Sequence, residues 1–145
     1  MSKGNTFETD LLALIFNATP IADLAADDQS SPATTLTVAL HTADPGDAGT
    51  QATSETAYTG YVRQTVARTA GGWSVTSPGG VGTVSPVANI DFPECTGAPG
   101  GPITHFSVGT GVANKLLYSG TVSPNIAVAV GVIQRLKTTS TITED

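Results

Sequence analysis

The feature of this sequence that most constrains its fold is a change of periodicity near residue 34. Before that point apolar residues recur at helical steps of three and four, and after it they alternate with polar residues. In the run 34–41, Leu36, Val38 and Leu40 lie on one side of an extended chain, and small or polar residues lie on the other. Asp44-Pro-Gly follows, in which proline presets φ and glycine accepts a positive φ. The pattern predicts a β-strand followed by a tight turn.

Short strand-like runs make up most of the remaining chain, each bounded by glycine, proline or serine. The predicted strands are 60–68, 73–76, 87–92, 103–108, 115–122, 126–130 and 134–143. Because no helical pattern separates them, we expect antiparallel pairing in a mainly β fold, an antiparallel β-sandwich or barrel. The stretches 79–82 and 97–102 are rich in glycine and proline and predict loops within that fold.

One N-terminal helix is predicted, over about residues 6–17. Asn5 or Thr6 can cap its first turn, where Glu8 interacts favourably with the helix dipole. Its apolar residues form one stripe that we expect to pack in the core: Phe7, Leu11, Leu14 and Ile15. The acidic stretch 20–33 has no strand pattern and predicts a loop or one weak helical turn.

Length and layout indicate one domain. A chain of 145 residues is the size of an ordinary domain. It can bury a hydrophobic core without needing disulfides or bound metal ions for stability. We expect a single domain over 1–145, made of the helix 6–17, the acidic loop 20–33 and a β domain over 34–143. The one cysteine, Cys95, cannot form a disulfide within the chain and predicts a small, semi-buried apolar side chain. A disulfide to a second chain is the alternative.

Charge argues against nucleic acid and membranes as partners. The chain has 12 acidic and 6 basic residues, a net charge of −6. Binding to phosphates needs clustered lysine and arginine, whereas these bases are scattered: Lys3, Arg63, Arg68, Lys115, Arg135 and Lys137. Charged residues make up only 12% of the chain, about half the usual share. We therefore expect part of the surface to face other protein.

No export or membrane signal is recognised in the sequence. The N-terminus lacks the long apolar core and cleavage site of a signal peptide. The longest apolar run, 11–16, is far shorter than the ~20 residues that span a bilayer. We expect the chain to be made in a cytoplasm and kept there until it assembles or is released.

Candidate catalytic and metal-binding residues are few. His41 and His105 could meet Asp44 or Asp47 at a metal, but two histidines in separate strand-like runs are more often structural. The sequence 44–47 lacks the alternating oxygens of a calcium loop, so the turn is preferred. A Ser-His-Asp triad is assembled in space and cannot be judged by counting. We predict no catalytic, cofactor or metal site, no cofactor and no enzymatic activity.

Aromatic side chains offer one further binding hypothesis. An exposed Trp73, Tyr58 or Tyr61 could stack on a carbohydrate. Trp73, however, follows two glycines and begins a strand-like run, where packing in the core is the preferred interpretation.

Several segments together resemble a known protein family. The run 36–47 (Leu-Thr-Val-Ala-Leu-His-Thr-Ala-Asp-Pro-Gly-Asp) is similar to a widespread family of small virion proteins of tailed phages and prophages, often labelled tail-fibre-like. The resemblance continues, in order, through 55–63, 72–73, 90–93, 103–108 and 115–120. This chain departs from the family by an acidic stretch around 23–31 and a long loop around 79–86.

The resemblance implies a non-enzymatic structural protein on the outer surface of a virion, made in the cytoplasm of a bacterial host. A small acidic β domain without repeats or heptads is a poor fibre. We therefore expect a capsid decoration (cement) protein that binds the major capsid protein and bridges capsid subunits, as a homo-oligomer for which a trimer is the natural guess. A tail-fibre, baseplate or neck component that contacts tail proteins or host glycans is the alternative. A small hydrolase on a β scaffold is the remote third.

Overall fold

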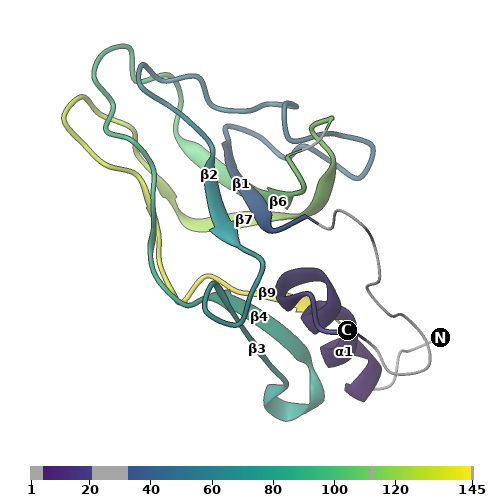
Figure 1. The fold of residues 1–145 in the computed structure, drawn as a ribbon. Coiled ribbons are helices and arrows are strands. Elements are labelled where there is room, and N and C mark those ends of the chain that lie inside the picture. The colour runs from purple at the N-terminus through teal and green to yellow at the C-terminus, as the bar shows by residue number, and fades with distance from the viewer. Residues whose placement is uncertain (1–4, 21–32, 112, 145) are drawn as a thin grey trace. The chain divides into compact units, whose positions relative to one another are not determined.

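The structure is a computed structural model that describes residues 5–20, 33–111 and 113–144, with side chains from Glu8 onward. Within these residues the fold is mainly β, with antiparallel strands and one α-helix near the N-terminus (Figure 1). The predicted fold class is confirmed. The predicted acidic loop lies almost wholly outside the described residues.

The chain divides into two compact units. Unit 1 comprises residues 1–35, 66–89 and 137–145, and unit 2 comprises 36–65 and 90–136. The expectation of a single domain over 1–145 stays a prediction.

Unit 1 is a helix packed on a small antiparallel sheet. Its elements are α1 (Asn5–Asn17), β3 (Trp73–Thr76), the 3-10 turn η1 (Pro78–Gly80), β4 (Gly82–Pro86) and β9 (Ile142–Glu144), and the sheet order is β3-β4-β9. Helix α1 contacts all three strands. Its Phe16 ring meets Trp73 edge to face at 4.9 Å, and Leu12 and Val84 are buried in the same unit. The core of unit 1 is therefore built between α1 and the sheet.

The predicted helix is confirmed, but the predicted buried stripe is wrong. The buried residues are Glu8, Leu12 and Phe16, while Leu11, Leu14 and Ile15 remain half-buried; Phe7 lies outside the described side chains. The run 11–16 is apolar all round, so spacing alone does not choose the face. The choice follows from close packing, because Gly82 brings the backbone of β4 against α1: a Cβ there would lie 3.0 Å from the Glu8 Cβ.

Arg68 closes the C-terminal end of α1. Its guanidinium donates to the carbonyl oxygens of Leu14 and Ile15, which are left without partners at a helix end. A cation in this place also interacts favourably with the helix dipole.

Unit 2 contains most of a four-stranded sheet in the order β2-β1-β6-β7. The strands are β1 (Thr35–His41), β2 (Gln64–Ala67), β6 (Ile103–Gly109) and β7 (Leu116–Ile126), with a separate short pair of β5 (Ile90–Asp91) and β8 (Arg135–Leu136). β1 and β6 are antiparallel, from Thr37 opposite Gly109 to His41 opposite His105. Residues 36–41 are all buried, so β1 is covered on both faces.

Several strand boundaries differ from the prediction. The run 79–86 was expected to be a loop, but it contains β4, the middle strand of its sheet. Its buried positions include Gly82 and Pro86, so it shows no apolar alternation. The predicted strands 115–122 and 126–130 are replaced by one strand, β7, and a loop, and 134–143 divides into β8 and β9.

Candidate functional site

One of the predicted candidate residues, His41, meets a serine in the interior of unit 2. The His41 Nε2 lies 2.8 Å from the Ser107 Oγ, and the His41 Nδ1 lies 2.9 Å from the Thr53 carbonyl oxygen. Because a carbonyl only accepts, Nδ1 carries the proton and Nε2 accepts from the serine hydroxyl. Gln51 donates to the Ser107 Oγ and to the Thr37 carbonyl. A histidine paired with a serine is the arrangement of a nucleophile and its base.

This pair is built as a structural network. His41, Ser107 and Gln51 are each 0% exposed, so a substrate has no access to the serine oxygen. The orienting group on His41 is a backbone carbonyl and not the carboxylate of a triad. Burial lowers the pKa of His41 below its usual 6.5, against the opposing effect of the Thr53 hydrogen bond. The network pairs both ring nitrogens of His41, and burial favours the neutral imidazole.

The proposed metal-ligating residues are only partly brought together. His105 lies directly opposite His41 across β1 and β6, and its Nδ1 is 2.9 Å from the Thr104 hydroxyl. Asp44 instead accepts from the Gly46 backbone N–H at 2.9 Å, and Gly46 has a φ of +70°. The predicted turn at 44–47 is therefore confirmed. In the described part of the chain, no three His, Cys, Asp or Glu side chains gather where they could hold a metal.

A charged clamp fixes the long connection between β1 and β2. The Glu55 carboxylate accepts two hydrogen bonds from the Arg63 guanidinium, both at 2.6 Å, and a third from the Tyr61 hydroxyl at 2.9 Å. The same hydroxyl accepts from the Leu40 N–H of β1, and Arg63 also donates to Asn114. These side chains come from the segment 55–63 that carries part of the family resemblance, so its polar residues hold the loop to the sheet.

The aromatic candidates for carbohydrate binding are mostly buried. Trp73 and Tyr58 are each 2% exposed, and the Tyr58 hydroxyl donates to the Pro93 carbonyl. Burial raises the pKa of Tyr58 to about 12. Tyr61 stacks on Phe92, with 6.0 Å between ring centroids. The prediction of a core role for Trp73 is confirmed, and Tyr58 likewise packs inward.

The most exposed apolar surface of unit 2 lies in the loop between β7 and β8. Val130, Val132 and Ile133 are 62%, 42% and 52% exposed. We call residues 127–133 the apolar loop. No charged residue occurs between Lys115 and Arg135, so β7 and the apolar loop form one uncharged stretch, 116–134. Exposed apolar residues that cluster in this way mark interaction surfaces.

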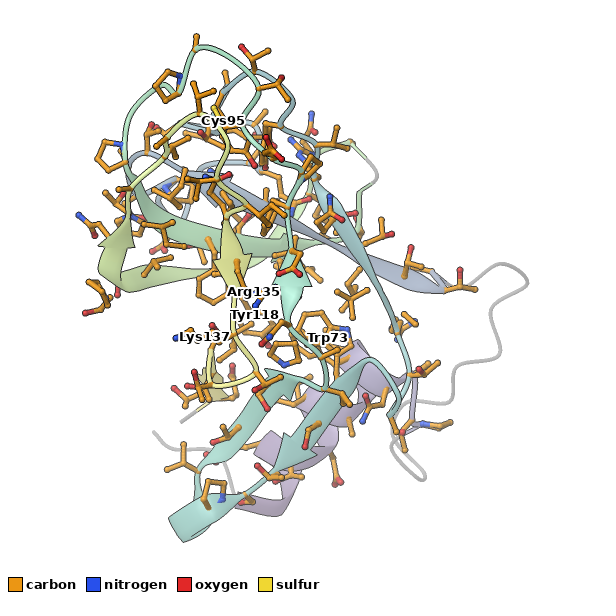
Figure 2. All side chains as sticks on the ribbon, turned by 90° about the vertical axis from the view of Figure 1, so that its left-hand side faces the viewer. Trp73, Cys95, Tyr118, Arg135 and Lys137 are labelled. Carbon is orange, nitrogen blue, oxygen red and sulfur yellow. The ribbon has the colours of Figure 1, made fainter. Side chains whose placement is uncertain are left out.

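Backbone hydrogen bonds hold the apolar loop in one conformation. The Val132 N–H donates to the Ala129 carbonyl, closing a turn with Gly131 at a φ of +81°. Gly131 and Val132 also exchange hydrogen bonds with the backbone of Cys95, at 2.9 and 3.1 Å. Cys95 is fully buried, where a semi-buried side chain was predicted, and Figure 2 shows it among the loops of unit 2, away from Arg135 of β8. The loop therefore presents its valines from a fixed backbone.

Comparison with known families gives one match, which covers nearly the whole chain. The model of the family described as "Podophage GP4 fiber I protein gp80" matches residues 5–143. The chain belongs to this family. Membership confirms the predicted resemblance to tail-fibre-like virion proteins, and a phage fibre family suggests a structural, non-enzymatic role in the virion. No curated protein matches the sequence.

The sequence analysis did not identify the apolar loop of this fibre I family member as a candidate interaction surface. A signal was present, because the uncharged stretch lies in a chain with 12 acidic residues. The run 126–130 was instead predicted to be a strand. Among the described residues, no helix is both long enough and apolar enough to cross a membrane.

Proposed function

We propose that this fibre I family member is a structural subunit on the outer surface of the phage particle, and that it acts as a decoration (cement) protein of the head. In this proposal the apolar loop docks on the major capsid protein, and the subunit bridges neighbouring capsid subunits. Many such contacts add through avidity and resist the pressure of packaged DNA.

One observation carries the proposal: an uncharged loop exposes valine side chains to solvent while backbone hydrogen bonds fix its conformation. Burying a fully exposed valine contributes about 1.5–3 kcal/mol. Because the backbone is already fixed by the Cys95 hydrogen bonds, little conformational entropy is lost when a partner covers the loop. The buried His41–Ser107 network and the clamped Glu55 supply stability and no open reaction site, which supports a non-enzymatic role.

A second candidate is a component of a tail fibre, because the matching family is described as a fibre protein. The same loop would then contact another fibre or tail protein. Against it, the described chain forms two small units and shows no long helix or repeated strand motif from which a fibre shaft is built.

The test uses two matched valines of unit 2. Val130 in the apolar loop and Val62 in the clamped connection are 62% and 60% exposed. A phage lacking this gene is complemented with Val130→Asp or Val62→Asp, and purified particles are probed for the protein. We expect Val130→Asp to be absent from particles and Val62→Asp to be present at the wild-type level. Normal incorporation of Val130→Asp would overturn docking through the loop.

The position on the particle is tested with the deletion phage itself. A decoration protein predicts particles that form, adsorb to the host normally and release DNA at a lower temperature than wild type. A fibre component predicts the reverse: normal heat resistance and failed adsorption. Normal heat resistance with failed adsorption would overturn the decoration role and would place the protein in the tail.

A further inference from the structure

The pairing of β5 with β8 continues beyond these two strands and reaches the apolar loop. The Phe92 N–H, directly after β5, donates at 2.9 Å to the carbonyl oxygen of Gln134, directly before β8. Cys95 then bonds to the backbone of the apolar loop. Residues 90–95 and 131–136 therefore run antiparallel over their whole length, and we call them together the ladder.

The side chains of the ladder alternate between a buried face and an outer face. On the outer face, Asp91 and Arg135 lie opposite each other and form an ion pair, so their charges offset one another. Nearer the apolar loop, the register leaves Pro93 and Glu94 together opposite Ile133. Glu94 is exposed and Ile133 is 52% exposed, so both belong to this outer face.

Glu94 places an uncompensated negative charge at the border of the apolar loop. Its carboxylate is exposed, and it forms no ion pair within the described part of the chain. The apolar loop itself contains no charged residue. A partner that covers the loop therefore has to accommodate a carboxylate at the edge of the contact. An acidic group on the partner would repel Glu94 there, whereas a lysine or arginine would pair with it.

Val130 projects from the tip of the apolar loop. The hydrogen bond from the Val132 N–H to the Ala129 carbonyl and the φ of +81° at Gly131 define a type II turn, in which Val130 is the second residue. Its side chain is 62% exposed. A flat partner surface would touch only the end of this side chain, whereas a pocket surrounds it and removes most of its apolar surface from water.

We propose that the partner of the apolar loop carries an apolar pocket that receives Val130, with a lysine or arginine at its border that pairs with Glu94. The inference rests on the proposed function, in which the loop docks on the particle, and it adds the chemistry of the surface on which the loop docks. The chain has a net charge of −6, so a basic border attracts it during approach. Burial of Val130 then slows dissociation.

The first experiment tests the basic border. The probe is purified particles of the phage that lacks this gene, immobilised and exposed to the purified full chain. We expect Glu94→Gln to associate about threefold more slowly than wild type at about 50 mM NaCl, and equally fast at about 500 mM NaCl, because salt screens exposed charges. Glu94→Lys would bring like charges together and should associate more slowly still.

Asp47→Asn is the matched control for the loss of one negative charge. Asp47 is exposed and lies in the loop before Gln51, whose N–H donates to the Asn114 carbonyl between β6 and β7. The apolar loop follows the other end of β7. Asp47→Asn should therefore associate like wild type at both salt concentrations. A Glu94→Gln variant that associates as fast as wild type or faster at low salt would overturn the basic border.

The second experiment tests the apolar pocket. Val130→Thr keeps nearly the same shape but brings a hydroxyl group into the contact. A hydroxyl buried without a partner costs enough that the variant should dissociate from the particles about tenfold faster than wild type at both salt concentrations. Val62→Thr, at a valine that is 60% exposed, should dissociate like wild type. Dissociation of Val130→Thr at the wild-type rate would overturn the pocket.

The outcomes separate this inference from the proposed function. Circular dichroism first checks that each variant is folded. A wild-type chain that does not bind the particles, or a Val130→Asp variant that binds them normally, would overturn docking through the loop and this inference with it. A Val130→Asp variant that fails to bind, together with a Glu94→Gln variant that associates normally, would overturn the basic border and leave the proposed function standing.

Discussion

Acid should destabilise unit 2 through His41. In the folded chain, burial lowers the pKa of this side chain below 6.5, while in the unfolded chain it titrates near the ordinary value. Below pH 6.5 the unfolded state therefore binds more protons than the folded state. Because the folded pKa is depressed, the free energy of unfolding falls as the pH falls through this window.

The magnitude follows from one proton. Between pH 7.5 and 5.5 the unfolded imidazole becomes about 90% protonated, and the loss approaches about 1.4 kcal/mol if the folded imidazole stays neutral. The window ends above pH 5, where carboxylates begin to titrate. Protonation would also give Nε2 a hydrogen, so that the Ser107 hydroxyl, which now donates to it, would have to turn away.

The assay can separate the two units because their chromophores differ. Tyr58, Tyr61 and Tyr118 all belong to unit 2, and the one tryptophan, Trp73, belongs to unit 1. Urea unfolding at pH 7.5 and 5.5, followed by near-ultraviolet tyrosine dichroism, reports unit 2. Tryptophan fluorescence reports unit 1 in the same samples.

Two variants identify the responsible group. His41→Gln should be less stable than wild type at pH 7.5 and should lose the pH dependence in the tyrosine signal. His105→Gln, on the neighbouring strand, should keep it. A wild-type tyrosine transition that does not move between pH 7.5 and 5.5, or one that moves equally in His41→Gln, would refute the reasoning.

Further predictions concern packing and charge. Glu55→Gln should lower the free energy of unfolding by about 1–2 kcal/mol in the urea titration, because it leaves the half-buried Arg63 guanidinium with a neutral partner. Asp91→Asn removes the charge from an exposed ion pair with Arg135 and should show no measurable loss of stability in the same titration. Gly82→Ala should lower the stability of unit 1 by about 1–3 kcal/mol, since its Cβ would press on Glu8. Gly71→Ala has room at 3.6 Å and should leave the tryptophan transition unchanged.

Local periodicity determined much of the secondary structure from sequence alone. The helix of residues 5–17, the strand 73–76 and the strand beginning at Ile103 lie close to where their patterns predicted them. The turn at Asp44 follows from proline, glycine and an aspartate that accepts from the backbone two residues on. The mainly β class and the family resemblance were likewise readable from the residues in order.

Tertiary structure decided which faces and which pairs those elements use. Spacing could not choose between Leu11 and Leu12 as the buried leucine of an all-apolar helix, and the close approach of Gly82 made the choice. The strand β4 was hidden because a buried position filled by glycine or proline carries no apolar signal. His41 and Ser107 are 66 positions apart and meet only because β1 and β6 pair in one register. Periodicity reports on neighbours within a few residues, whereas burial and strand pairing depend on contacts between segments that are distant in the chain.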